Sequence, residues 1–323
     1  MTAPHDPVLS ATVVAAIDDL ELSARLVVEG MRTGGNRSPF HGYSTEFRQH
    51  RPYRAGDDLK FLDWKLFARS DRLYTRQFRE TTNVPVMFVV DASASMAFPV
   101  ADEPGVLAGY GAAAPPVAKF RYAAIMAAAL AYVASDQGNA VGLMATTGGA
   151  LRYLPARGGR QHLRTLIAML DGLQPAGQWE PARVIDRAAQ LLRRRGIVVV
   201  ISDFYDDEPG TARALRRVTR HGHDVSVVQL LAPEETTFVD DGQVEFVDLE
   251  SGARQTTDAG AVGQRYRSAM REFVARTRTA ALHSGIDYLQ LSTDTPPERA
   301  LRDYLQRRGA RHLAGHAHRP MAR

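Results

Sequence analysis

The stretch that decides the fold is Val84–Met96, which reads VPVMFVVDASASM. Its segment Val86–Val90 is apolar, rich in β-branched residues and only about five residues long, which favours a buried central strand over a helix. Directly after it, Asp91, Ser93 and Ser95 alternate with alanines. A carboxylate and two hydroxyls at every second position of a tight turn can point into one small volume. Hard divalent cations prefer such oxygen ligands, so the stretch predicts a Mg²⁺ site.

The composition is that of an ordinary folded protein, with 323 residues, 45% of them hydrophobic and 24% charged, enough for one large or two modest domains. The absence of cysteine excludes disulfides, thiolate zinc sites and cysteine nucleophiles. The first ten residues lack the pattern of a signal peptide, and no apolar run approaches the roughly 18–20 residues of a membrane span. We therefore expect a cytoplasmic protein.

The net charge is +4, and arginines cluster at Arg193–Arg195 and at Arg216, Arg217 and Arg220. A basic surface suits nucleic acid or an acidic protein partner. Solvated helix faces explain the same clusters more simply. The sequence contains no RNA-binding aromatic signature and no zinc-finger spacing, so nucleic acid is the weaker expectation.

Apolar strands alternate with helical patterns from residue 84 onward, which predicts an α/β fold with a doubly wound, mostly parallel sheet. The pattern predicts further strands at residues 140–145, 151–154, 197–201, 225–231 and 286–291, and helices at 119–135, 161–173, 181–194, 211–221, 262–283 and 297–306.

Composition divides the chain into four parts. We expect a disordered leader (1–9), an N-terminal extension that packs on the main domain (10–82), the main domain (83–308) and a disordered tail (309–323). The extension should hold a helix over 10–31, a short helix over 59–66 and a strand over 73–78. Two insertions interrupt the main domain, a loop near 98–117 and a hairpin near 236–258.

A second acidic residue closes another buried strand. The apolar run Ile197–Ile201 ends in Ser202 and Asp203. In a doubly wound sheet, ligands bind outside the carboxyl ends of the strands, near the switch point. We therefore expect Asp91 and Asp203 to share one site.

The DxSxS turn with a later strand-closing Asp resembles the von Willebrand factor A fold and its metal-ion-dependent adhesion site. A wider ordered set of motifs resembles the bacterial domain-of-unknown-function 58 family, over roughly residues 20 to 305. That set is Glu46-Phe47, Arg51-Pro52-Tyr53, Gly56-Asp57, Asp63-Trp64, Ala68-Arg69, Asp91-Ala92-Ser93-Ala94-Ser95-Met96 and Ile201-Ser202-Asp203-Phe204.

This resemblance implies a von Willebrand factor A-like domain that acts as a cytoplasmic adaptor. Members of the family are commonly encoded beside MoxR-type AAA+ ATPases. The resemblance therefore implies a MoxR-type ATPase as partner in a chaperone-like system of protein-complex assembly or maturation.

The chain departs from the adhesion-site pattern at one position. An intact site also uses a Thr from the loop before a later helix, and this chain has Trp179 and Glu180 there. Glu180 is a possible substitute ligand, and Thr146 and Thr147 lie on a different loop. Trp179 at the rim would also be able to occlude the site. Alternatively, the DxSxS side chains only cap the following backbone through hydrogen bonds.

The function expected first is a binding module without catalysis. Asp91, Ser93 and Ser95 would hold the cation, Asp203 would orient a water or Ser93, and an open position would accept a carboxylate from a partner's Asp or Glu. The alternatives are a metal-dependent phosphatase or hydrolase that uses Asp91, and nucleic-acid binding through the arginine clusters. A P-loop, a GxSxG elbow and an HExxH motif are all absent.

Overall fold

A six-stranded sheet forms the centre of the computed structural model, which describes residues 10–33, 45–53, 62–80, 84–99, 117–205, 208–237 and 242–317. Five of its strands are parallel and the edge strand β5 is antiparallel to β4. The order across the sheet is β10 (Asp287–Ser292), β7 (Asp224–Leu231), β6 (Ile197–Ser202), β3 (Pro85–Asp91), β4 (Ala140–Thr147) and β5 (Ala150–Arg157).

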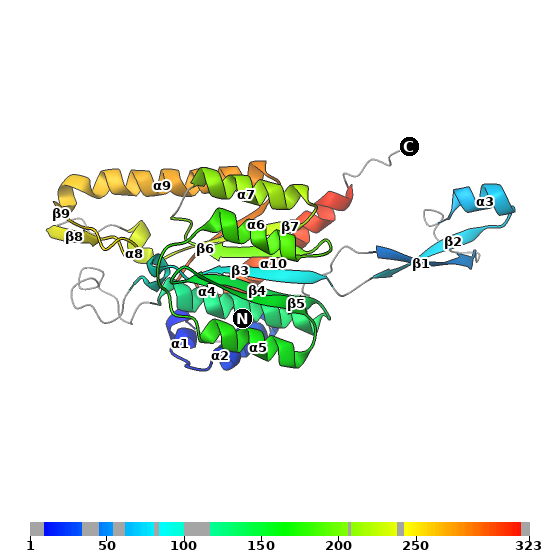
Figure 1. Cartoon of the computed structure of the whole chain (residues 1–323), viewed down its shortest axis with the longest axis horizontal. Coiled ribbons are helices and arrows are strands. Elements are labelled where there is room, and N and C mark those ends of the chain that lie inside the picture. The colour runs from blue at the N-terminus through cyan, green and yellow to red at the C-terminus, as the bar shows by residue number, and fades with distance from the viewer. Residues whose placement is uncertain are drawn as a thin grey trace, which may run out of the picture.

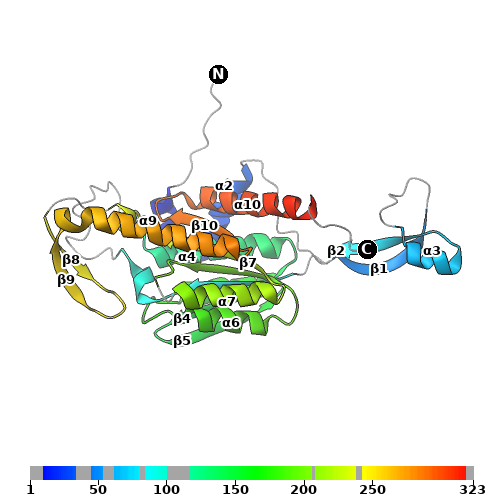
Figure 2. The same cartoon turned by 90° about the horizontal axis from the view of Figure 1, so that it is seen from above.

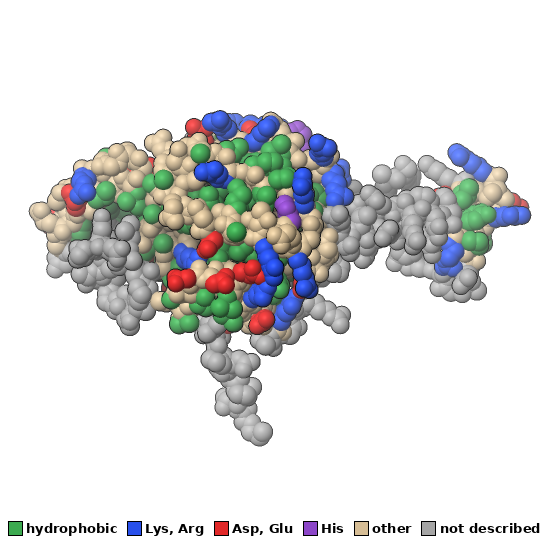
Figure 3. Space-filling view, turned by 60° about the horizontal axis from the view of Figure 1, so that its bottom comes forward, with side chains coloured by type: hydrophobic (Ala, Val, Ile, Leu, Met, Phe, Trp, Pro, Cys, Tyr) green, Lys and Arg blue, Asp and Glu red, His purple; other side chains and the backbone are tan. Residues whose placement is uncertain are grey.

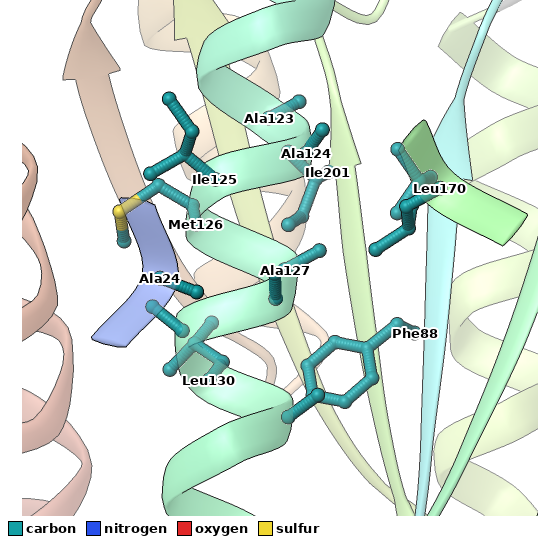
Figure 4. Close-up of a cluster of buried hydrophobic side chains, with 14 of the residues drawn as sticks. Ala24, Phe88, Ala123, Ala124, Ile125, Met126, Ala127, Leu130, Leu170 and Ile201 are labelled. Carbon is teal, nitrogen blue, oxygen red and sulfur yellow. The ribbon is translucent and has the colours of Figure 1, made fainter. Parts of the chain in front are cut away.

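Strand β3 lies in the middle of the sheet, between β6 and β4, and all seven of its residues are buried. Period-two alternation sends its side chains into two different cores. Phe88 joins the cluster around helix α4 (Lys119–Asp136), whose Ala127 and Leu130 pack beside it (Figure 4). Met87 and Val89 join the cluster on the other face. A strand buried on both faces explains why the run is continuously apolar.

Helices cover both faces of the sheet, which confirms the predicted α/β, doubly wound architecture (Figures 1 and 2). The predicted strands and helices of the main domain are present, with ends shifted by a few residues except for the last helix, which runs on to Ala317. No helix within the described ranges is both long and apolar enough to cross a membrane. One face carries α4, α5 (Arg160–Asp171), α2 (Leu20–Thr33) and α10 (Pro297–Ala317), and the other carries α6 (Pro181–Leu191), α7 (Glu208–Arg220) and α9 (Ala259–His283).

The helix predicted over residues 10–31 is in fact two helices, α1 (Ala11–Ala15) and α2. The break has a local cause. The Asp19 carboxylate accepts hydrogen bonds from the backbone N–H groups of Glu21 and Leu22, at 2.8 and 3.1 Å, and so starts a new helix. Helix α2 then packs against α4, as the extension was predicted to do.

The rest of the extension does not follow the prediction that the extension packs on the main domain. Strands β1 (Thr45–Pro52) and β2 (Tyr74–Glu80) pair antiparallel with α3 (Trp64–Ser70) between them. This arm projects from the end of the body where β3 begins (Figures 1 and 2), instead of packing on the main domain. The short helix predicted over 59–66 begins only at Trp64, because the Asp63 side chain accepts from the Leu66 N–H at 3.0 Å and caps it there.

The predictions for the two insertions and for the tail compare differently with the structure. The predicted hairpin is present as β8 (Gln243–Val247) and β9 (Arg254–Asp258), which follow the short helix α8 (Pro233–Thr236). Most of the predicted loop near 98–117 lies outside the described residues. The tail predicted to be disordered from residue 309 is helical up to Ala317, and no proline lies between Pro297 and Pro320 to interrupt the helix.

Candidate functional site

Asp91 lies at the carboxyl end of β3 with its side chain fully buried. Its Oδ1 accepts a hydrogen bond from the Ser93 N–H at 2.8 Å, so this side chain caps the following backbone. Its Oδ2 accepts from the Ser202 hydroxyl at 2.6 Å, which ties the ends of β3 and β6 together. Burial, followed by the nearby Asp203 carboxylate, raises the pKa of Asp91 to about 7.

Ser93 and Ser95 follow on the same turn, with 3.1 Å between their hydroxyl oxygens. Two neighbouring ligands of an octahedral Mg²⁺ at about 2.05 Å stand about 2.9 Å apart. The pair therefore has the spacing of two adjacent vertices of a Mg²⁺ shell. The short 3-10 helix Ala94–Ala97 fixes this geometry.

Backbone hydrogen bonds hold the loop before α6 against the DxSxS turn, where the resemblance places it. The Ala94 N–H donates to the Gly177 carbonyl at 2.9 Å, and the Ala176 N–H donates to the Ala92 carbonyl at 3.0 Å. Gly177 has φ +70°, and a Cβ there would lie 3.0 Å from the Cα of Gly148. Glycine thus allows the close approach of the two loops.

Trp179 does not sit over the turn. It is buried in the apolar cluster with Met87, Val89 and Val184, so it anchors the loop. Glu180 is 62% exposed and forms an ion pair with Arg183 at 3.1 Å. The residues predicted at this position therefore bring no hydroxyl to the turn.

The two threonines named as substitutes differ. Thr147 donates its hydroxyl to the Gln174 carbonyl and is occupied. Thr146 pairs in register with Asp91 on the neighbouring strand. Its Oγ1 is buried and has no hydrogen-bond partner. Thr146 is thus the hydroxyl that remains for a ligand at this edge, and it also lines a pocket of about 420 Å³ with Glu180 and Arg183.

Asp203 directly follows β6, as predicted, and it pairs with Lys119, a residue that was not predicted to belong to the site. The fully buried Lys119 ammonium donates to Asp203 Oδ2 at 2.7 Å and to Glu235 Oε1 at 2.5 Å. Burial alone would lower the pKa of Lys119, but the two carboxylates outweigh burial and raise it. The ring of Tyr205 lies 4.9 Å from the Lys119 nitrogen and completes the enclosure.

One signal would have revealed Lys119. It is the first residue of α4, where the helix dipole disfavours a cation. It also opens a helix whose first turns, apart from Arg121, are buried and mostly apolar. A lysine in both settings needs a buried carboxylate partner. Glu235 offered no comparable signal, because it lies on the short helix α8 beside the hairpin insertion.

A further carboxylate reaches the site from that insertion. Glu250, in the turn between β8 and β9, lies close enough to Ser93, Asp203 and Lys119 for each of them to act on its pKa. Burial, followed by the negative charges of Asp203 and Asp248, raises the pKa of Glu250. Glu250 lies within the hairpin predicted near 236–258, which was not expected to reach the DxSxS turn.

The donor set fits a hard cation of modest affinity. Among the described residues, no group of three or more His, Asp or Glu side chains is arranged to hold a metal ion. What the edge offers instead is the buried carboxylate of Asp91, two serine hydroxyls and the unpartnered Thr146 hydroxyl. The charged neighbour that most affects Asp91 is another carboxylate, so a cation would relieve repulsion there.

In the arginine clusters, Arg217 pairs with Asp186. Outside them, Arg121 pairs with Asp171 at 3.2 Å. Acidic and basic side chains adjoin one another on the face drawn in Figure 3. Salt bridges of this exposed kind contribute little to stability and are typical of a solvated surface.

Residues 49–280 match the family described as "Protein of unknown function DUF58". The chain belongs to this family. The "Uncharacterized protein Rv1480" of Mycobacterium tuberculosis (strain ATCC 25618 / H37Rv) is 32% identical over 327 residues, which cover 96% of this chain and 93% of that protein. Membership of the DUF58 family confirms the prediction made from the motifs.

The sheet of this DUF58 protein is mostly parallel, with an antiparallel edge strand and helices on both faces. Solved structures with some likeness include the "conserved hypothetical protein BatB" of Bacteroides thetaiotaomicron, with a TM-score of 0.46, 14% identity and coverage of 71% of this chain and 100% of that chain. The "SpRpn10 VWA domain" has a TM-score of 0.39, 12% identity and coverage of 69% and 95%. We take no function from these two.

Proposed function

We propose that this DUF58 protein is a non-enzymatic, cytoplasmic interaction module whose contact point is the sheet edge at Asp91. The observation that carries the proposal is the buried Asp91 carboxylate beside two hydroxyl oxygens 3.1 Å apart. This arrangement supports a Mg²⁺ site held by Asp91, Ser93 and Ser95, with the Thr146 hydroxyl as a further donor. When bound, Mg²⁺ supplies a Lewis-acid position for a carboxylate oxygen of an acidic partner residue.

The chain's own residues prepare this edge. Ser202 and the Ser93 N–H hold both oxygens of Asp91 in place. Lys119 and the Tyr205 N–H hold Asp203, whose carboxylate stands close enough to act on Asp91 electrostatically. In this proposal Asp203 orients a water or Ser93 and does not bind the cation directly.

The partner we propose is a MoxR-type AAA+ ATPase, or a client of one, that offers an Asp or Glu to this edge. The support for this part is the DUF58 family membership together with the chemistry of the site. A net charge of +4 favours encounter with an acidic surface. The process served would be assembly or maturation of a protein complex.

The test is a pull-down with the full chain as bait, in Mg²⁺ and in chelator. Wild type should retain a MoxR-type ATPase or another protein in Mg²⁺ and lose it in chelator, and Asp91→Ala should lose it in both. Asp136→Ala is the matched control, because Asp136 is exposed and pairs only with Arg32 among the described residues. Retention by Asp91→Ala in Mg²⁺ at the wild-type level would refute the proposal.

A further inference from the structure

The β8–β9 hairpin brings its turn to the DxSxS loop from a distant part of the sequence. We propose that Glu250 is a ligand of the cation site at Asp91, Ser93 and Ser95, so that the insertion supplies in cis a ligand in place of the one that the loop before α6 does not bring to the turn. This inference rests on the proposed function and assigns one more residue to the same site.

The position of the Glu250 side chain carries the inference. The carboxyl group lies near Ser93, Asp203 and Lys119, each of which acts on its pKa. Its Oε1 is buried and has no hydrogen-bond partner. A buried carboxylate oxygen without a partner is costly, and a cation beside Ser93 would satisfy it. Lys119 does not fill this role, because its ammonium donates to Asp203 and Glu235.

The turn is built to present this side chain. The Asp248 carboxylate accepts from the Glu250 N–H at 2.9 Å and from the Ser251 N–H at 3.3 Å, which fixes the turn backbone. On β8, the ring of Phe246 lies 6.1 Å from that of Tyr266 on α9. Figures 1 and 2 show the hairpin and the start of α9 at one end of the molecule, beyond the sheet.

Helix α9 is in turn fixed to the site. Tyr205, two residues after Asp203, stacks on Phe273 with ring centres 5.2 Å apart. Its hydroxyl also contacts the sulfur of Met270 at 3.7 Å. The hairpin is thus braced on a helix that is itself attached to the end of β6, so the position of Glu250 relative to Ser93 is set by packing on both sides.

The chemistry of the ligand set also supports Glu250 as a ligand. Without Glu250 the edge offers one carboxylate and neutral hydroxyls, a weakly charged set for a divalent cation. Glu250 adds a second anionic oxygen, the ligand type that Mg²⁺ prefers in proteins. An acidic residue of a partner would then compete with Glu250, and binding of the partner would release the turn.

The experiment is titration of full-length protein with Mg²⁺ by calorimetry, combined with hydrogen exchange over residues 248–253. Glu250→Gln should weaken Mg²⁺ binding about tenfold or more. Mg²⁺ should slow exchange of the turn amides in wild type and not in Glu250→Gln. The matched control is Glu245→Gln on the same hairpin, whose carboxylate pairs with Arg254 at 2.9 Å and whose affinity should equal wild type.

Wild-type affinity and wild-type exchange in Glu250→Gln would overturn the inference. The variant Asp91→Asn separates this failure from failure of the proposed function. If Asp91→Asn loses Mg²⁺ and Glu250→Gln does not, the site stands and Glu250 is not its ligand. If both bind Mg²⁺ as wild type does, the cation site itself is wrong.

Discussion

Within the described residues, one lysine or arginine side chain is buried near the amino ends of the sheet strands and one near their carboxyl ends, and the surroundings of the two charges differ. At the amino ends of the strands, Arg308 of α10 pairs with Asp224 and lies 3.9 Å from Asp287, while it donates to the Ser226 hydroxyl at 3.1 Å. At the carboxyl ends, Lys119 of α4 pairs with Asp203 and Glu235. Both cations are 3% exposed or less.

The difference lies in the carboxylates. Those around Arg308 are 38% and 21% exposed, so water shares in their solvation. Those around Lys119 are at most 10% exposed, and the buried Asp91 stands beside them with no cation among the charged groups that act on it. The ion pair at the amino ends of the strands is therefore balanced in charge and structural in role. The carboxyl ends hold an excess of negative charge that suits a bound cation.

The largest effect should come from Lys119→Met. Removal of this ammonium leaves Asp203 and Glu235 buried without a counter-charge, which should cost about 3–5 kcal/mol of unfolding free energy. Urea unfolding at pH 7 in chelator measures it. A loss below that of the corresponding Arg308 variant would show that the two edges do not differ in this way.

The second largest effect on stability should come from Asp91→Asn, and its size should depend on pH. The pKa of Asp91 is about 7 in the fold against an ordinary 3.8, so the folded protein keeps a proton that the unfolded chain releases. Wild-type stability should therefore fall as pH rises from about 4 to about 7. In chelator above pH 7, the Asp91→Asn variant should be more stable than wild type, by on the order of 2–4 kcal/mol.

The difference between the two pH profiles isolates Asp91, because Glu235, whose pKa burial also raises, is present in both proteins. Parallel profiles for wild type and Asp91→Asn would contradict the excess negative charge assigned to this edge. Added Mg²⁺ should stabilise wild type above pH 7 and leave Asp91→Asn unchanged.

Arg308→Met should have a smaller effect, about 1–3 kcal/mol, because Asp224 and Asp287 can turn to solvent when their partner is lost. The same urea series measures it. Mg²⁺ affinity should not change, since this side chain lies at the opposite edge of the sheet. A weakened Mg²⁺ affinity would mean that the two edges are coupled.

The smallest effect belongs to Glu180→Gln. This carboxylate is exposed and pairs with Arg183, so we expect stability within about 0.5 kcal/mol of wild type. Mg²⁺ affinity should stay within about twofold. A tenfold loss would restore Glu180 as the substitute ligand, a role for which the sequence made it a candidate.

The fold could be predicted from the sequence, and so could the location of the candidate site at the carboxyl ends of the strands, because both depend on short-range patterns. Val86–Val90 and Ile197–Ile201 are apolar runs that stop at an Asp or at Ser-Asp, and parallel strands bring such ends together. The family followed from motifs spread over much of the chain.

What the sequence could not place depends on long-range packing. The sequence marks Lys119 as an unusual lysine, but its partners Asp203 and Glu235 are defined only once its helix is docked beside them. Glu250 lies far from the DxSxS turn in the sequence, on an insertion whose position is set by α9. The projecting arm has an amphipathic strand pattern that does not say whether another domain covers it.

The most direct test of the cation site is calorimetric titration of Mg²⁺ into wild type and Asp91→Asn at pH 8, each freed of metal beforehand by a chelator. The account predicts one Mg²⁺ bound per wild-type chain and none bound by Asp91→Asn, with both proteins folded. Absence of Mg²⁺ binding by wild type, or equal binding by the two proteins, would contradict it.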